Sequence, residues 1–203
     1  MENGINIASF IIGIVGTASG IVGVYLTIRS NKKNKQMKNI TWNDLLLATK
    51  YFYKKLQQQN YVPDIIVTPG HKGGIVAQLL SDYYGLPIPI LAGVIFPSKY
   101  ANINIEGYTL LNTSKWNVYI PKIVFSIDHR EDKKILIIDD FVMSGDFLHS
   151  LRQKLKEYNY NDNNIKSCAV AVTQVAVDSY KNSDYYFKIV NDSGFNFPWG
   201  KAK

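Results

Sequence analysis

The amino-acid sequence predicts an α/β protein with an open, mainly parallel, twisted sheet flanked by helices, preceded by a single transmembrane helix. Two observations predict the sheet. Short apolar runs, as at 65–67 and 135–138, each lead into a glycine-containing turn, and a stretch with helical spacing follows each turn. This is the order of a βαβ unit. A third observation, an uncharged apolar run at 5–28, predicts the membrane helix.

Length and composition indicate one globular domain with a short accessory segment. The 203 residues suffice for one domain of about 150 residues and little more. With 46% apolar and 19% charged residues the chain can bury a core, which excludes a disordered chain and a polytopic membrane protein. The lone cysteine, Cys168, excludes an internal disulfide and a cysteine-rich zinc site, so we expect the folded part in a reducing compartment.

The basic charge of the chain is local. The net charge is +7, but residues 29–38 alone hold five lysines and arginines and no acid. Residues 41–200 hold 16 basic and 15 acidic residues. A nearly neutral body lacks the electrostatic pattern of a nucleic-acid-binding protein, so we expect no nucleic acid among the partners.

Residues 1–28 are predicted to be a transmembrane anchor, with the apolar span at 5–28. About 20 apolar residues cross a bilayer core. A signal peptide is the alternative, but it carries positive residues before its apolar run, whereas here Glu2 precedes the run and five cations follow it. The positive-inside rule then predicts a single-pass membrane protein with its N-terminus outside and its domain cytoplasmic. A basic juxtamembrane linker at 29–40 connects the anchor to the domain at 41–203.

Gly16 and Gly20 form a GxxxG pattern inside the predicted anchor. Such a face lets two membrane helices approach closely, which favours a homodimer. Small residues are also common in membrane helices in general. The pattern therefore leaves both interpretations open.

The first half of the domain predicts helix, strand, turn, helix and strand in that order. Thr41, with Asp44 three residues later, is expected to cap a helix that ends near Asn60. The next elements are expected at 64–68 (strand), 69–74 (tight turn), 75–84 (helix) and 88–95 (strand, weakened by Pro89). Residues 96–120 are polar and are expected to be either a mobile loop or an irregular hairpin.

The second half contains the densest signal. An apolar strand at 135–138 runs into Asp139 and Asp140, and a short glycine loop then leads to a helix at 147–158. Further strands are expected at 167–172 and 185–190. This order predicts two carboxylates at the carboxyl edge of a central strand, which is where open parallel sheets bind ligands.

The motifs around these acids resemble those of type I phosphoribosyltransferases. The strand, the acidic pair and the glycine loop are similar to the family's phosphoribosyl pyrophosphate signature, and His71-Lys72-Gly73-Gly74 is similar to its pyrophosphate loop. Trp42, Asp64 and Phe197-Pro198-Trp199 resemble residues of purine members of the xanthine-guanine and hypoxanthine type. The resemblance runs from Thr41 to the end of the chain. It implies that fold, and transfer of phosphoribosyl from phosphoribosyl pyrophosphate to a nucleobase, a purine in the similar members, with release of pyrophosphate.

The resemblance also implies a role for each motif. Asp139 and Asp140 would bind the ribose hydroxyls and Mg²⁺, the ion through water, since Mg²⁺ takes few carboxylates. The 5′-phosphate would lie at a helix N-terminus, where backbone N–H groups favour an anion, formed by Met143, Ser144, Gly145, Asp146 and Phe147. The pyrophosphate would lie at His71, Lys72, Gly73 and Gly74, and the base at Phe197, Trp199 and Lys166. Without the resemblance, Gly73-Gly74 is equally explained as a strand-to-helix turn, and the two aromatics as core or lid.

Several positions depart from the family pattern. Purine members usually have a carboxylate at the position of Met143, whose thioether cannot exchange a proton with the base. Asp146 and Phe147 stand where Gly and Thr are usual; an acid repels a phosphate, and Phe lacks a hydroxyl donor. Lys166 is a weak substitute for the lysine of the purine enzymes. Two hypotheses remain: an active, membrane-anchored phosphoribosyltransferase, or a degenerate domain that binds a nucleotide or sugar phosphate as a membrane-tethered sensor or defence effector.

Overall fold

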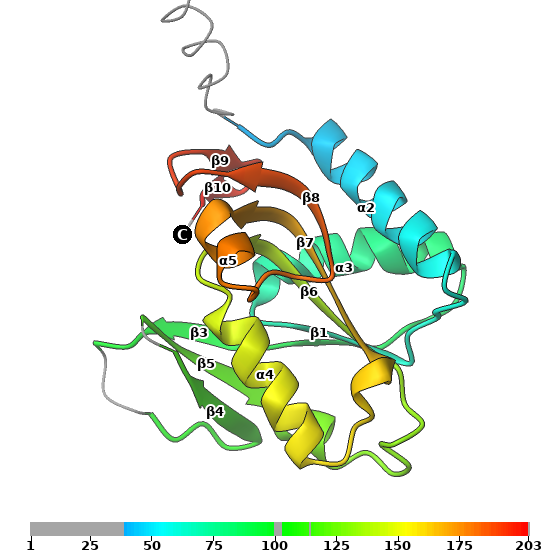
Figure 1. Ribbon diagram of the computed structural model, residues 1–203. Coiled ribbons are helices and arrows are strands. Elements are labelled where there is room, and N and C mark those ends of the chain that lie inside the picture. Colours follow the sequence, from blue (N-terminus) through cyan, green and yellow to red (C-terminus); the bar gives the residue numbers. More distant parts are fainter. Residues whose placement is uncertain (1–38, 100–102, 114, 203) are drawn as a thin grey trace, which may run out of the picture. The chain divides into compact units, whose positions relative to one another are not determined.

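The computed structural model of the protein describes residues 39–99, 103–113 and 115–202 (Figure 1). The predicted anchor, the GxxxG pair and most of the basic linker lie outside these residues, so the membrane helix, its topology and the homodimer stay predictions. Within the described ranges, no helix is both long enough and apolar enough to cross a membrane.

Five parallel strands form the main sheet, in the order β2-β1-β6-β7-β8. In that order they are β2 (Ile90–Ala92), β1 (Ile65–Thr68), β6 (Ile135–Val142), β7 (Ile165–Thr173) and β8 (Tyr185–Val190). The chain moves outward from β1 to β2 on one side and from β6 to β8 on the other. The direction of strand addition therefore reverses between β1 and β6, and the predicted α/β fold with a parallel sheet is confirmed.

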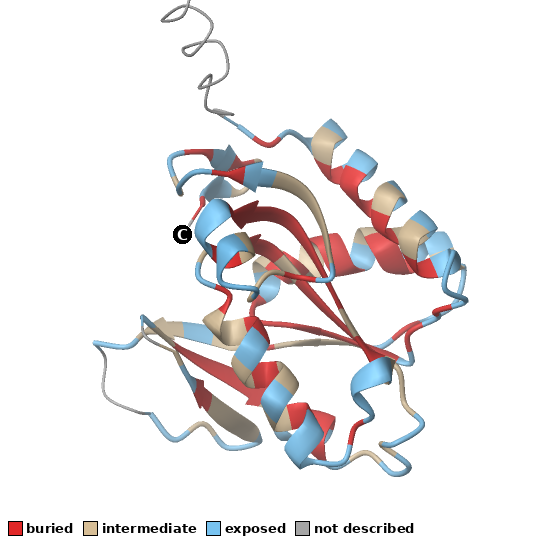
Figure 2. Cartoon of the chain, viewed as in Figure 1, coloured by how far each residue is buried: buried red, intermediate tan, exposed pale blue. Residues whose placement is uncertain are grey.

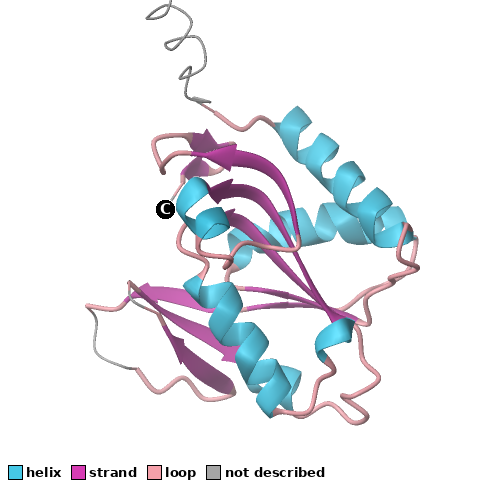
Figure 3. Cartoon of the chain, viewed as in Figure 1, coloured by secondary structure: helices cyan, strands magenta, loops and turns pink. Residues whose placement is uncertain are grey.

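Helices cover both faces of the main sheet (Figures 1 and 3). On one face lie α2 (Trp42–Gln57) and α3 (His71–Tyr84), packed against each other, and on the opposite face lies α4 (Asp146–Glu157). A short helix, α5 (Gln174–Asp178), follows β7, and single 3₁₀ turns occur at Lys122–Phe125 and Asp162–Asn164. The predicted start of α2 is confirmed, because Thr41 and Asp44 make both hydrogen bonds of a capping box.

Helix α3 begins four residues earlier than the sequence pattern indicates. The tight turn predicted at 69–74 is wrong from His71 onward, because His71–Gly74 form the first turn of the helix, and Gly74 N–H donates to the Gly70 carbonyl at 3.3 Å. Glycine lowers helix propensity, so the pattern excluded this turn. A Cβ at Gly73 would lie 2.7 Å from the Ile138 carbonyl oxygen of β6. Only glycine lets α3 approach the strand this closely.

Residues between β2 and β6 form a second, antiparallel sheet. Its order is β3-β5-β4, with β3 at Val94–Pro97, β5 at Trp116–Pro121 and β4 at Tyr108–Asn112. The single strand predicted at 88–95 is wrong, because the chain changes sheets at Gly93. A Cβ there would lie 2.6 and 2.7 Å from the carbonyl oxygens of Pro69 and Tyr119. Of the two interpretations of 96–120, the hairpin agrees with the structure.

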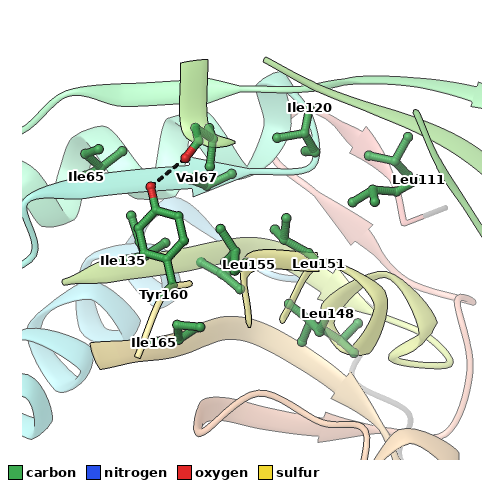
Figure 4. Packing of buried hydrophobic residues seen from close by; sticks show 14 of the residues in the cluster. Ile65, Val67, Leu111, Ile120, Ile135, Leu148, Leu151, Leu155, Tyr160 and Ile165 are labelled. Atoms are coloured by element: carbon green, nitrogen blue, oxygen red, sulfur yellow. Dashed lines mark hydrogen bonds between the residues drawn. The ribbon is translucent and has the colours of Figure 1, made fainter. Parts of the chain in front are cut away.

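One face of helix α4 is buried against the main sheet and the small sheet. Figure 2 shows the buried residues along the strands and on the inner faces of the helices. Leucines of α4 pack in one cluster with residues of both sheets (Figure 4), among them Leu148, Leu151, Leu155, Ile135 and Ile120. Tyr160 donates its hydroxyl to the Val124 carbonyl at 2.5 Å, and burial raises the pKa of Tyr160 to about 12, which keeps the donor protonated. This packing holds α4, and with it the helix N-terminus, in place against both sheets.

The two ends of the described domain are joined by hydrogen bonds. The C-terminal residues form a short antiparallel hairpin, β9 (Asn196–Phe197) and β10 (Gly200–Lys201). Ile40 N–H donates to the Asn196 carbonyl at 2.7 Å, and Ile40 is 2% exposed. Residues 39 and 40, which the sequence assigns to the linker, are thus bound to the C-terminal hairpin.

An ion pair between Asp44 and Lys188 predicts a defined pH dependence of stability. The Lys188 Nζ lies 2.6 Å from Asp44 Oδ1, and both side chains are mostly buried. Burial raises the pKa of Asp44, but the hydrogen bonds from Lys188 and Thr41 outweigh it and lower the pKa from 3.8 to about 2. A depressed folded-state pKa stabilises the protein above pH 3.8, by about 2 kcal/mol here, and this contribution is lost as the pH falls toward 2.

Urea unfolding of wild type and Asp44→Asn at several pH values tests this linkage. We expect the difference in unfolding free energy to be largest near pH 6 and to shrink as the pH falls below 3.8. The difference in unfolding free energy between wild type and Lys188→Gln should shrink with falling pH to a similar extent, because Lys188 is the strongest donor to the carboxylate. A difference that stays constant from pH 6 to pH 3 would contradict the assignment.

Candidate functional site

Asp139 and Asp140 lie where the main sheet reverses its strand order. The pairing of β1 with β6 ends at Val67 and Ile137, whereas β6 continues beside β7 to Val142. The acids are therefore part of the strand and stand beyond the end of the β1 ladder. In open parallel sheets this reversal is the expected ligand-binding position.

The two carboxyl groups share one partly enclosed site. Consecutive strand residues normally point to opposite faces, yet the pKa of each of these two carboxyl groups is affected by the other. Loss of solvent raises the pKa of Asp139 well above its usual range, and the charge of Asp140 raises it further. Burial also raises the pKa of Asp140, although hydrogen bonds with Asp139 and Trp199 and the charge of Lys72 oppose that rise. Such a pair would be relieved by a divalent cation or by hydroxyl donors.

Trp199 brings the C-terminal hairpin onto the acidic pair. Its indole Nε1–H donates to Asp140 Oδ2 at 3.2 Å. Its ring stacks on Phe197 with centroids 5.0 Å apart and planes 4° apart, and meets Trp42 in a T-shaped contact at 6.1 Å. Phe197 is 3% exposed. Of the two aromatics predicted to bind a base, Phe197 supports Trp199 from the core, and Trp199 is the one that reaches the acids.

The predicted pyrophosphate motif divides into structural and open positions. The space beside the Gly73 Cα is occupied by the backbone of β6, as described above, so Gly73 has a structural role. A Cβ at Gly74 would have no atom within 4 Å, so the helix surface there is open. Lys72 is close enough to Asp140 for its charge to lower the pKa of that acid, and His71 is exposed. The first turn of α3 thus combines a cation, open backbone and a helix N-terminus, an arrangement that favours anions.

The predicted phosphate loop, residues 143–147, follows the acids and runs into the first turn of α4, which begins at Asp146. Gly145 precedes the helix with φ +75°, a conformation that favours glycine. The Met143 carbonyl accepts a hydrogen bond from the Thr173 hydroxyl. Ser144 is exposed, and Phe147 packs against the core cluster, which explains an apolar residue at its position. Asp146 Oδ1 lies 2.9 Å from Lys181 Nζ.

Lys166 is not brought to this site. In the β6–β7 ladder it is opposite Leu136, whereas Asp139 is opposite Ala169. Three residues along a strand correspond to about 10 Å, so Lys166 lies at the amino end of β7. Sequence patterns also missed Lys181, which belongs to no recognisable motif and reaches the phosphate loop only through the loop between α5 and β8.

Removing the indole N–H while keeping the ring should isolate the contact between Trp199 and Asp140. We expect Trp199→Phe to lower the free energy of unfolding by about 1.5–3 kcal/mol, because a buried carboxylate loses a charge-assisted hydrogen bond. The matched control is Trp42→Phe, since Trp42 is 56% exposed and a phenyl ring keeps its contact. Urea unfolding measures both variants. Equal stability of Trp199→Phe and wild type would refute the role of this bond.

Comparisons with known proteins agree with the fold. The chain matches no family model and no curated protein by sequence. Among solved structures it is similar to a purine phosphoribosyltransferase from Pyrococcus horikoshii Ot3, with a TM-score of 0.57 and 23% identity over 80% of this chain and 92% of that one. It is also similar to the xanthine-guanine-hypoxanthine phosphoribosyltransferase of Helicobacter pylori, with a TM-score of 0.57 and 17% identity over 80% and 93%.

A third solved structure is a hypothetical protein from Neisseria gonorrhoeae with bound ppGpp, with a TM-score of 0.56 and 16% identity over 82% and 90% of the two chains. At these identities the likeness is one of fold. The described domain therefore has the type I phosphoribosyltransferase fold, as the sequence motifs predicted.

Proposed function

We propose that the protein is a membrane-anchored phosphoribosyltransferase that transfers phosphoribosyl from phosphoribosyl pyrophosphate to a nucleobase, a purine, and releases pyrophosphate. The observation that carries this proposal is the position of Asp139 and Asp140 at the strand reversal, next to the first turns of α3 and α4. Two acids suit the ribose diol of phosphoribosyl pyrophosphate, and two helix N-termini suit its 5′-phosphate and its pyrophosphate group. The fold of two purine phosphoribosyltransferases supports the same assignment.

Each part of the site has a task in this reaction. The base nitrogen attacks the anomeric carbon as pyrophosphate leaves, through a sugar with cationic character, and the proton of that nitrogen passes to the departing pyrophosphate or to water. Asp139 and Asp140 orient the ribose and stabilise that positive charge, while Lys72 and the α3 N-terminus stabilise the departing anion. Trp199 offers a flat ring for the base and keeps Asp140 in place through its N–H. Catalysis of this kind depends on positioning and electrostatics, so Met143 is compatible with it.

The acidic pair fits Mg²⁺. Mg²⁺ binds through one or two carboxylates together with water and substrate phosphate oxygens, and Asp139 and Asp140 have raised pKa values that a cation would lower. Within the ranges described, no group of three or more His, Cys, Asp or Glu side chains gathers to bind a metal. When bound, the ion would neutralise diphosphate charge; the two aspartates would hold it, through water.

A second candidate function is supported by the loop itself. Met143 provides no acid or base at the position where purine enzymes usually have one, and the similar Neisseria protein was solved with a bound nucleotide, ppGpp. A domain that binds a nucleotide or sugar phosphate without turnover, as a membrane-tethered sensor or defence effector, would fit both observations.

One experiment separates these functions. The full chain in detergent is titrated calorimetrically with phosphoribosyl pyrophosphate and Mg²⁺, and pyrophosphate release is then measured with a panel of nucleobases. Release with at least one purine supports the transferase. Tight binding of the sugar phosphate or a nucleotide, with no release for any base, supports the sensor instead. No binding of either ligand rejects both.

The membrane anchor and the homodimer remain part of the proposal. The apolar run at 5–28 and the basic residues after it support a single-pass protein with a cytoplasmic domain. Resistance of the full chain to alkaline extraction from membranes is expected, and release into the soluble fraction would contradict the anchor. Two differently tagged copies should co-precipitate, and Gly16→Leu with Gly20→Leu should abolish this if the helices pair.

A further inference from the structure

The negative charge of Asp146 in the proposed phosphate loop is balanced by a nearby lysine. Its Oδ1 lies 2.9 Å from Lys181 Nζ, and 39% of the Lys181 side chain and 26% of the Asp146 side chain are exposed. The pair carries no net charge and remains within reach of a ligand from solvent. The repulsion that the sequence predicts for a phosphate here is therefore offset by a residue 35 positions away in the chain.

The fold fixes Lys181 at the loop through its backbone as well as its charge. A Cβ on Gly145 would overlap the Lys181 carbonyl oxygen, so the two backbones are in direct contact. Lys181 N–H donates to the Ala176 carbonyl at 3.0 Å. The Thr173 hydroxyl donates to the Met143 carbonyl and accepts from Ala176 N–H. The segment 173–181 thus contacts the loop at Met143, Gly145 and Asp146.

We propose that Lys181 is the cation that binds the 5′-phosphate of the substrate, and that Asp146 holds its ammonium group beside the first turn of α4 until the phosphate replaces the carboxylate as its partner. This inference rests on the proposed function, since the loop is part of that site. A phosphate offers more acceptor oxygens and more charge than a carboxylate. It can also accept from the N–H groups that open α4, which an anion at a helix N-terminus is expected to do.

The two members of the pair then have opposite effects on phosphate affinity. Lys181 increases it, because its ammonium donates a charge-assisted hydrogen bond. Asp146 decreases it, because it competes for the same ammonium and repels the phosphate. A purely structural ion pair would give equal effects for the two residues, or none.

Calorimetric titration of the full chain in detergent with ribose 5-phosphate tests the proposal. We expect Lys181→Gln to weaken binding about tenfold or more, the usual effect of losing a charge-assisted hydrogen bond. Lys181→Arg should retain most of the affinity, and Asp146→Asn should bind several-fold more tightly than wild type. The matched control is Lys154→Gln, which removes the cation of an ion pair with Glu157 at the other end of α4, and should bind like wild type.

Two results would overturn the inference. Equal affinity of Lys181→Gln and wild type for ribose 5-phosphate would do so while leaving the transferase intact, because pyrophosphate release from phosphoribosyl pyrophosphate tests that separately. Equal weakening by Lys181→Gln and Lys181→Arg would assign Lys181 a structural role. Because the pair is partly exposed, we expect these variants to fold with stability close to wild type, which urea unfolding checks.

Discussion

Asp140→Asn is expected to reduce pyrophosphate release from phosphoribosyl pyrophosphate by at least about 100-fold. Loss of one electrostatic contact to developing charge typically lowers turnover by about 10²–10³-fold. The substitution keeps the shape of the side chain and an acceptor for Trp199 Nε1–H, so the change is confined to charge. Turnover by the full chain in detergent, with saturating base, measures the effect.

Stability separates this loss of function from a loss of fold. Asp139 and Asp140 are both raised in pKa by loss of solvent, so replacing one by a neutral amide removes an unfavourable buried charge. We expect the melting temperature of Asp140→Asn to equal or exceed that of wild type, as is common for residues retained for function. Asp178→Asn, at an exposed aspartate of α5, is the control and should keep full turnover. Retention of more than about a tenth of the turnover by Asp140→Asn would remove the central argument for the transferase.

The arrangement of the main sheet was predictable because its signals are local. Apolar runs ending in glycine turns or acids fix the strands, and Thr41 with Asp44 fixes the start of α2 through a capping box. The strand Tyr185–Val190 agrees with the range expected from its apolar residues. Elements whose identity depends on their own side chains were therefore found from the sequence.

The differences between the predicted and the observed elements have a common physical cause, which is close backbone contact over long sequence distances. The sequence pattern placed Gly73 in a turn and Gly93 within a strand, but each glycine is needed where another backbone passes within van der Waals distance. One lies inside a helix and the other lies at the change between two sheets. Glycine gives the same signal for a turn, a close approach or a helix end, so no local pattern separates these uses.

In the candidate site, too, local features could be predicted from the sequence, whereas contacts between distant residues could not. The acidic pair and the glycine loop were recognisable because they are contiguous in the sequence. The contact from Trp199 to Asp140 and the pairing of Lys181 with Asp146 join residues 59 and 35 positions apart. Lys166 was assigned by its nearness to a strand in the sequence, and the β6–β7 register places it at the wrong end of that strand. Residues that complete a site from other elements require the fold.

Alanine substitutions at the neighbouring residues Gly73 and Gly74 are expected to have opposite effects on stability. A Cβ at Gly73 would lie 2.7 Å from the Ile138 carbonyl oxygen, and backbone cannot give way as a side chain can, so Gly73→Ala should cost about 3 kcal/mol or more. A Cβ at Gly74 meets nothing within 4 Å. There, alanine should stabilise the first turn of α3 by about 0.5–1 kcal/mol, or about 1–4 °C in melting temperature for a domain of this size.

The same two variants test whether the first turn of α3 binds pyrophosphate. If the anion rests on the open backbone at Gly74, the added methyl group takes up its space, so Gly74→Ala should be more stable than wild type yet bind pyrophosphate about tenfold more weakly, a loss of about 1.4 kcal/mol. Calorimetric titration with pyrophosphate and Mg²⁺ measures this, and thermal unfolding measures stability on the same samples. A stabilised Gly74→Ala that binds pyrophosphate as wild type does would show that this glycine serves only the strand-to-helix transition. Because stability and affinity are predicted to change in opposite directions at Gly74, partial unfolding cannot imitate the expected result.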